Sequence, residues 1–172
     1  MKVKQTLPSL TVLRGLLAAL ILLLVAGCAS APPPPPAAAA PSRADVLQAL
    51  GFERTEDGFV LNLPGPLLFE TGSDVLSENA VARLAKLASD LRAIRIDRLR
   101  LFGHTDNVGS ADFNRALSTK RAEAVAQAMA SHGFTNDRLE RRGFGFDRPL
   151  AGNDTPEGRA KNRRVAVIVP FE

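Results

Sequence analysis

A run of five consecutive prolines, Pro32–Pro36, divides the chain and limits what it can fold into. The run lies in a segment rich in Ala and Pro that extends from residue 29 to about residue 41. Such a segment cannot build a hydrophobic core, so we expect an extended, semi-rigid spacer of about 3.1 Å per residue. Residues 43–172 are left to fold, and they are enough for one compact domain.

The segment before the spacer has the features of an export signal. Three basic residues accompany an apolar stretch over residues 15–25, which is shorter than the about 20 residues of a transmembrane helix. The sequence that follows, Leu24-Val25-Ala26-Gly27-Cys28, resembles a bacterial lipobox. This resemblance implies a signal peptide over residues 1–27, lipidation of Cys28, and a linker over residues 28–42. An ordinary signal peptide with a chance cysteine is the alternative.

The charge of the chain gives little support for a nucleic-acid partner. Lys and Arg number 22 and Asp and Glu 18, a net charge of +4. Three of the basic residues and none of the acidic ones precede Cys28, which leaves 22 − 3 = 19 basic and 18 acidic residues from there on, about +1. The chain also lacks Trp and Tyr, and with them the stacking surface of many nucleic-acid binders. We therefore expect no nucleic-acid partner.

Strand and helix patterns alternate along residues 43–172. The last pattern is the clearest, because Val165, Val167 and Val169 alternate with Ala166 and Ile168, so both faces are apolar, as in a central strand. The alternation predicts an α/β (α+β) sandwich with at least one right-handed crossover. The predicted strands cover residues 59–63, 67–69, 96–102, 139–145 and 163–170, and the predicted helices residues 77–93 and 110–131.

Two charged residues, Asp106 and Arg121, lie on different predicted elements. Asp106 follows a strand, and Arg121 shares one helical face with Asn114, Leu117 and Ser118, at positions i, i+3, i+4 and i+7. This face begins near the helix N-terminus, which attracts anions, and an arginine can bind a carboxylate through two parallel hydrogen bonds. An anion and a cation so placed suit a ligand that carries both charges, such as a zwitterionic amino acid.

Three motifs resemble one family at the family's spacing. They are Gly103-His104-Thr105-Asp106, then Asn114-x-x-Leu117-Ser118-x-x-Arg121-Ala122, and then Asn162-Arg163-Arg164-Val165. They are similar to the OmpA-like C-terminal domain, over about residues 57–170, and the lipobox and spacer match its lipid-anchored subgroup, the peptidoglycan-associated lipoproteins. The resemblance implies a two-layer βαβαββ-type sandwich, with a mixed sheet and its helices on one face.

The resemblance also implies a function. The domain would bind peptidoglycan without catalysis, cofactor or metal, through the diaminopimelate of the stem peptide. It would tether an outer membrane to the cell wall, anchored by lipid and facing the periplasm. Asp106 would receive the ligand's ammonium and Arg121 a carboxylate. The same cleft would include Asn114, Leu117, Thr105, and Arg163 or Arg164.

Other interpretations stay open. Asp106 and Arg121 could form a structural ion pair. A second function is that of a protein-interaction lipoprotein, a partner of the Tol system or of an inner-membrane receptor, with Arg43–Glu56 as a docking segment outside the domain. A hydrolase triad of His104, Asp106 and Ser118 is disfavoured, because residues two apart in a strand lie roughly 6–7 Å from each other. His132 has no metal-ligand spacing to His104.

Overall fold

The computed structural model describes residues 41–70 and 72–171, which belong to one compact unit, Pro41–Glu172. Cys28 and nearly all of the Ala/Pro-rich segment lie outside the described residues. The hydrophobic core described runs from Leu47 to Val169, so this unit has a core of its own. None of the described helices combines the length and the apolar character needed to cross a bilayer.

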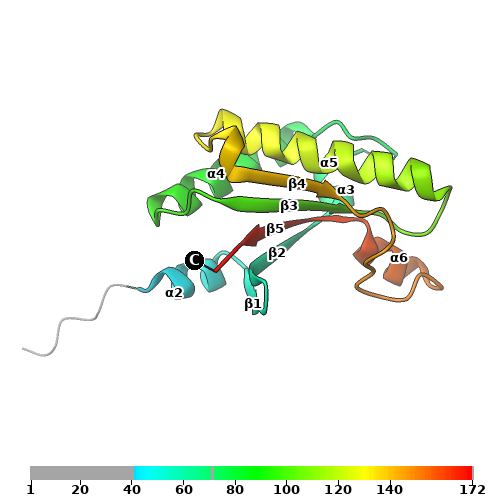
Figure 1. Cartoon of the computed structure of the whole chain (residues 1–172), viewed down its shortest axis with the longest axis horizontal. Coiled ribbons are helices and arrows are strands. Elements are labelled where there is room, and N and C mark those ends of the chain that lie inside the picture. The colour runs from blue at the N-terminus through cyan, green and yellow to red at the C-terminus, as the bar shows by residue number, and fades with distance from the viewer. Residues whose placement is uncertain (1–40, 71, 172) are drawn as a thin grey trace, which may run out of the picture. The chain divides into compact units, whose positions relative to one another are not determined.

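A five-stranded mixed sheet forms one layer of the domain, in the order β1-β2-β5-β3-β4 (Figure 1). Strands β3 and β4 are parallel, and the other neighbours are antiparallel. Strand β5 lies at the centre, and its six residues are all buried, which confirms the predicted two-sided strand. The strands are β1 Glu53–Thr55, β2 Gly58–Pro64, β3 Leu99–His104, β4 Leu139–Gly143 and β5 Arg164–Val169.

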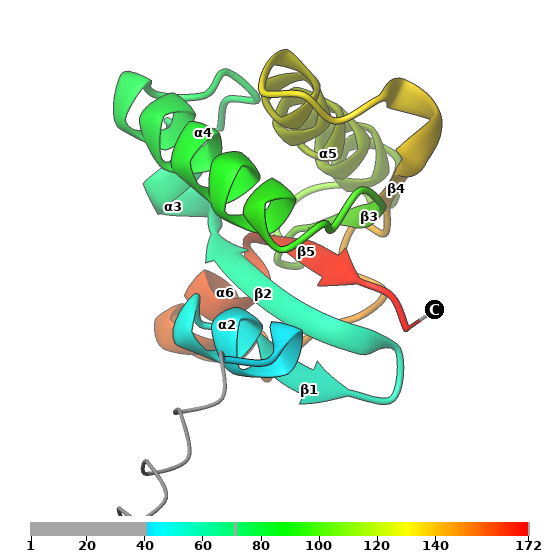
Figure 2. The ribbon, with the colours of Figure 1, turned by 90° about the vertical axis from the view of Figure 1, so that its left-hand side faces the viewer.

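Two long helices, α4 (Glu78–Ala93) and α5 (Ala111–Ser131), cover one face of this sheet (Figures 1 and 2). Each begins after a serine whose Oγ accepts a backbone N–H, from Ala80 to Ser77 and from Phe113 to Ser110, at 3.2 Å in both cases. Helix α5 connects the parallel strands β3 and β4. The predicted sandwich of βαβαββ type is confirmed, with β1 added at one edge.

Two glycines bring α5 close to the sheet. A Cβ atom at Gly103 would lie 2.0 Å from the carbonyl oxygen of Ser118, and one at Gly143 would lie 2.3 Å from Oγ1 of Thr119. Neither distance is possible between non-bonded atoms, so only glycine permits this approach. The first half of α5 is thereby placed directly beside the end of β3, where the first of the three motifs lies.

Several predicted boundaries differ from the structure. The extended piece expected over residues 67–69 is wrong, because α3 (Gly65–Leu68) is a helical turn there. Pro64 ends β2, and Pro66 lies in the first turn of α3, where a missing N–H costs nothing. Strand β3 begins three residues later than predicted and β4 ends two residues earlier. Helix α6 (Pro156–Asn162) was not predicted.

The segment Arg43–Glu56, which we expected outside the domain, is part of the fold. It forms helix α2 (Arg43–Ala49) and strand β1, which pairs with β2. Leu47 and Phe52 are each only 2% exposed and belong to the same core as the long helices. Deleting the segment to test partner binding would therefore also remove core packing.

We expect Leu47→Ala to lower the free energy of unfolding by roughly 2 to 3 kcal/mol, because a buried leucine leaves a cavity when it is truncated. Gln48→Ala, on the exposed side of the same helix, is the matched control and should change it by less than about 0.5 kcal/mol. Urea denaturation followed by circular dichroism measures both. Equal midpoints for the two variants would show that α2 does not contribute to the cooperative core.

Candidate ligand-binding cleft

A cleft of about 920 Å³ opens where β3 ends and the loop to α5 begins. Its walls come from four separate parts of the chain: the segment around α3, the loop after β3, the first half of α5, and the end of α6. Six of the seven ligand-binding residues predicted from the sequence line it: Thr105, Asp106, Asn114, Leu117, Arg121 and Arg163.

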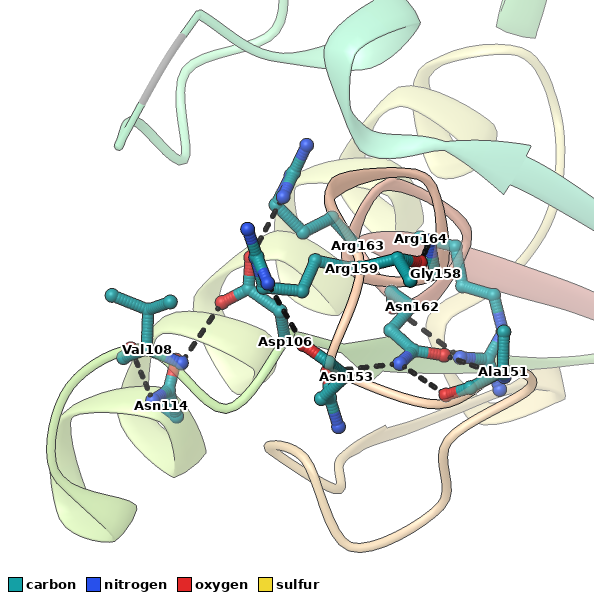
Figure 3. A network of polar contacts seen from close by, with 11 residues as sticks. Asp106, Val108, Asn114, Ala151, Asn153, Gly158, Arg159, Asn162, Arg163 and Arg164 are labelled. Atoms are coloured by element: carbon teal, nitrogen blue, oxygen red, sulfur yellow. Dashed lines mark hydrogen bonds and ion pairs between the residues drawn. The ribbon is translucent and has the colours of Figure 1, made fainter.

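The carboxylate of Asp106 has a fixed orientation in this cleft. The residue is 8% exposed. Its Oδ2 accepts a hydrogen bond from Nη1 of Arg163 at 2.7 Å, and its Oδ1 accepts one from the backbone N–H of Val108 at 3.1 Å (Figure 3). A carboxylate oxygen can accept more than one hydrogen bond, so both oxygens keep capacity for a ligand.

The loop between β3 and α5 is tied to the helix that follows it. Nδ2 of Asn114 donates to the carbonyl oxygens of Val108 at 2.9 Å and Ser110 at 3.2 Å. Asn114 is 2% exposed. Because Val108 also donates to Asp106, a continuous chain of hydrogen bonds leads from Arg163 through Asp106 and Val108 to α5 (Figure 3). These hydrogen bonds hold the cleft in its shape without a bound ligand.

The guanidinium of Arg121 is the cation of the opposite wall. Its Nε donates to the carbonyl oxygen of Ser73 at 3.0 Å, and its Cζ lies 5.1 Å from the centre of the Phe69 ring. Burial lowers the pKa of Arg121, the carboxylates of Asp74 and Asp106 oppose that shift, and Arg163 adds to it. The two Nη atoms make no hydrogen bond to any residue that the structure describes, so they are available to a ligand.

Arg163 and Arg164 point to different surroundings, as expected for neighbours at the start of a strand. Arg164 does not line the cleft, so the structure does not place it with the other six. Its Nε donates to Oδ1 of Asn62 at 3.1 Å, and its Nη atoms donate to the carbonyl oxygens of Asn162 at 3.3 Å and Arg148 at 3.1 Å. Burial lowers the pKa of Arg164 to about 10.

The ion pair of the cleft differs from the one considered from the sequence. Asp106 pairs with Arg163, and the described residues contain no ion pair between Asp106 and Arg121. Arg159 also lines the cleft, and its Nη1 donates to the carbonyl oxygen of Asn153 at 2.8 Å. Phe69 and Arg159 line the cleft although neither was predicted as a ligand-binding residue, because their places there depend on tertiary contacts and not on spacing along the chain.

The residues of the triad considered above have other partners. His104 stacks on Phe144, with ring centres 5.5 Å apart. Oγ of Ser118 donates to the carbonyl oxygen of Arg115 and accepts the N–H of Gly145, both at 2.9 Å. Ser118 and Asp106 thus have other hydrogen-bond partners, and neither is hydrogen-bonded to His104 in the described part of the chain. Across the described ranges, no group of three His, Cys, Asp or Glu side chains is placed to bind a metal ion.

His104 predicts a pH dependence of stability. Burial, followed by the charges of Arg164 and Arg148, lowers the pKa of His104 to about 3 from its ordinary value of 6.5. Between these two pKa values, His104 binds a proton in the unfolded chain and stays neutral in the folded chain. The free energy of unfolding therefore falls as the pH drops from 6.5 towards 3. Between about pH 8 and about pH 5, we expect a loss of about 2 kcal/mol in the wild type that His104→Gln lacks.

Urea denaturation of the wild type and His104→Gln at both pH values measures this difference. The exposed His132 is present in both proteins and cancels in the comparison. Parallel pH profiles for the two proteins would contradict a neutral, buried His104.

The fold and the cleft define a class of protein: a two-layer domain of mixed sheet and helices with an acidic and a basic side chain in one cleft. The OmpA family model matches residues 68–163, and the chain belongs to this family. The outer-membrane lipoprotein YfiB of Pseudomonas aeruginosa is 42% identical over 127 residues, which are 74% of this chain and 76% of that protein.

Two other similar proteins are described by their relation to the cell wall. The peptidoglycan-binding protein ArfA of Mycobacterium tuberculosis is 39% identical over 105 residues, 61% of this chain and 32% of that protein. The solved cell wall anchor of the type VI secretion system from Pseudomonas aeruginosa has a TM-score of 0.62 at 31% identity, and the match covers 75% of this chain and 94% of that one.

Proposed function

We propose that this domain binds peptidoglycan without catalysis, through the diaminopimelate of the stem peptide, and tethers an outer membrane to the cell wall. One observation carries the proposal: a buried carboxylate and a buried guanidinium, Asp106 and Arg121, line one preformed cleft in a member of the OmpA family. The relatives named as a peptidoglycan-binding protein and as a cell wall anchor support it.

The chemistry of the ligand fits these two side chains. The free end of diaminopimelate carries an ammonium and a carboxylate on the same carbon atom. The ammonium donates to the oxygens of Asp106, which Arg163 and Val108 hold in place. The carboxylate accepts from the free Nη atoms of Arg121, whose Nε is fixed by Ser73. Charge-assisted hydrogen bonds of this kind are about twice as strong as neutral ones.

Thr105 gives a third contact to the ligand. Its Oγ1 is buried at the cleft and has no hydrogen-bond partner among the described residues. A buried hydroxyl without a partner is uncommon, and a ligand or a water molecule supplies the missing hydrogen bond. Leu117 and the methylenes of Arg159 border the same space and contact the aliphatic chain of diaminopimelate.

The remainder of the chain provides the tether. Lipidation at Cys28 anchors it in the outer membrane, and the segment over residues 28–42 joins the anchor to a domain that faces the periplasm. The relative named as an outer-membrane lipoprotein supports this location. A single clamp needs only modest affinity, because many copies between one membrane and one wall act together through effective concentration.

Calorimetric titration of the lipid-free domain, residues 41–172, tests the proposal with two soluble muramyl tripeptides. One carries diaminopimelate, and the other carries lysine, which keeps the ammonium and lacks the carboxylate. We expect tighter binding of the diaminopimelate peptide by about tenfold or more, because the lysine peptide leaves Arg121 without its partner. Equal affinities, or release of shortened peptide products, would contradict a diaminopimelate clamp that does no catalysis.

A further inference from the structure

A second groove, lined by arginines, lies at the opposite end of the sheet from the cleft. Strand β3 runs from Leu99 to His104; the cleft opens beyond its last residue, and this groove of about 530 Å³ lies beside its first. Figure 1 shows the arrangement, with α2 and the C-terminal end of the chain at one end of the domain and α6 at the other. Five arginines line the groove: Arg43, Arg95, Arg98, Arg100 and Arg138.

The positive charge of this groove is only partly compensated. Arg100 pairs with Glu140 at 3.2 Å, and Arg138 lies 3.8 Å from the carboxylate of Asp97 and 3.7 Å from that of Asp137. Among the residues that the structure describes, Asp97 is the acidic residue that lines the groove. Arg95 and Arg98 are exposed, and neither lies within ion-pair distance of a carboxylate in the described part of the chain. Both guanidinium groups therefore face solvent, and the charge of Arg98 interacts with the carboxylate of Asp137.

Arg95 follows the C-terminal end of helix α4, in the left-handed conformation that closes many helices. Arg95 adopts φ 61°, and no other described residue besides the glycines has a positive φ. The N–H of Ile96 donates to the carbonyl oxygen of Leu91 at 3.0 Å, and the N–H of Arg95 donates to that of Arg92 at 2.9 Å, which is the hydrogen-bond pattern of a Schellman cap. This cap places Arg95 at the groove.

An apolar residue completes the groove. Phe171 is 47% exposed and lines it together with Pro170. The guanidinium of Arg54 lies 5.4 Å from the centre of the Phe171 ring and extends the basic surface beyond the groove. Arginines beside an exposed aromatic ring suit a membrane interface, where the ring enters the headgroup region and the cations meet lipid phosphates.

We propose that this groove binds the anionic phospholipid headgroups of the membrane to which the chain is anchored. The polypeptide leaves the domain at Ser42, next to the groove residue Arg43, and only 13 residues lie between Ser42 and Cys28. That segment spans at most about 50 Å, so the groove stays within reach of the membrane surface. The orientation of the groove towards the membrane rests on the proposed lipidation of Cys28, whereas the binding of lipid by the groove does not.

Co-flotation of the lipid-free domain with vesicles tests the proposal. One set consists of phosphatidylethanolamine with phosphatidylglycerol as the anionic lipid, and the other of neutral phosphatidylcholine. We expect salt-sensitive binding to the anionic vesicles alone. The double variant Arg95→Glu/Arg98→Glu should lower the partition coefficient at least about tenfold. If that variant does not fold, Arg95→Gln/Arg98→Gln replaces it.

The matched control is Arg83→Glu/Lys120→Glu, which makes the same change in net charge on exposed faces of α4 and α5. It should keep vesicle binding. Binding of the wild type to neither vesicle type, or an equal loss in the control, would overturn the proposal. Binding to polyglutamate without binding to vesicles would also overturn it, and would assign the groove to an acidic protein segment.

The same variants separate this proposal from the proposed function. Arg95→Glu/Arg98→Glu should bind the diaminopimelate peptide like the wild type, because the groove and the cleft lie at opposite ends of β3. Asp106→Asn should in turn bind anionic vesicles like the wild type. A wild-type domain that binds anionic vesicles and does not bind the diaminopimelate peptide would therefore contradict the proposed function of the cleft and not the proposal for the groove.

Discussion

Asp106→Asn is expected to weaken binding of the diaminopimelate peptide by about a hundredfold or more. The substitution preserves the shape of the side chain and removes its charge, which leaves the guanidinium of Arg163 without a counterion. The ligand's ammonium then meets an uncompensated cation at the point where it needs an anion. Removing one member of a buried charge pair in a binding site typically costs about 2 to 5 kcal/mol. Calorimetric titration gives the affinity directly.

Asp112→Asn is the matched control for this variant. Asp112 lies exposed in the first turn of α5, close to the cleft in sequence, and does not line it. The Asp112→Asn substitution makes the same change in net charge as Asp106→Asn, and this variant should keep the affinity of the wild type within about twofold. If both variants lose affinity equally, the general electrostatic field of the domain, and not the Asp106 carboxylate, attracts the ligand.

Arg121→Ala is expected to remove the preference for diaminopimelate over lysine. The two peptides differ by the carboxylate that Arg121 binds, so the variant should lose about a hundredfold in affinity for the diaminopimelate peptide and little for the lysine peptide. Arg121→Lys keeps the charge and should recover only part of the loss, because lysine cannot form two parallel hydrogen bonds to a carboxylate. Both peptides are titrated into each variant.

Lys120→Ala provides the control on the same helix. Lys120 is exposed, carries the same charge as Arg121 and makes no contact with the cleft. Because Arg121 also contacts Phe69 and Ser73, the stability of each variant is measured by urea denaturation before its affinity is interpreted. A folded Arg121→Ala that still prefers diaminopimelate would show that another residue reads the carboxylate.

The sequence predicted the layers of the fold because its strongest patterns agree with the final packing. The apolar stretch over residues 165–169 reads as a two-sided strand, and the structure places it at the centre of the sheet. The predicted helices began at Ser77 and Ser110, and the structure has these two serines as the N-caps of the long helices, because an N-cap is a local interaction. Boundaries set by turns, as at α3, were predicted less well, since Pro64 and Pro66 permit several local conformations.

The cleft was predicted in part for a similar reason. Asn114, Leu117 and Arg121 share a helical face, so their spacing alone brings them together. The pairing of Asp106 with Arg163 joins residues 57 positions apart and depends on how β3 and β5 align, which no local pattern encodes. The same holds for Phe69 and for the choice between Arg163 and Arg164. Contacts between residues far apart in the sequence form only when the strands of the sheet have assembled, so local sequence patterns do not predict them.

Release of the wall-bound domain by free amino acids tests the central claim most directly. The lipid-free domain is sedimented with purified diaminopimelate-type peptidoglycan, washed with meso-diaminopimelate or with lysine, and quantified on gels because the chain lacks Trp and Tyr. We predict release by diaminopimelate at concentrations at which lysine releases none. Equal release by both compounds, or by neither while the domain stays on the wall, would contradict a cleft that binds the zwitterionic end of diaminopimelate.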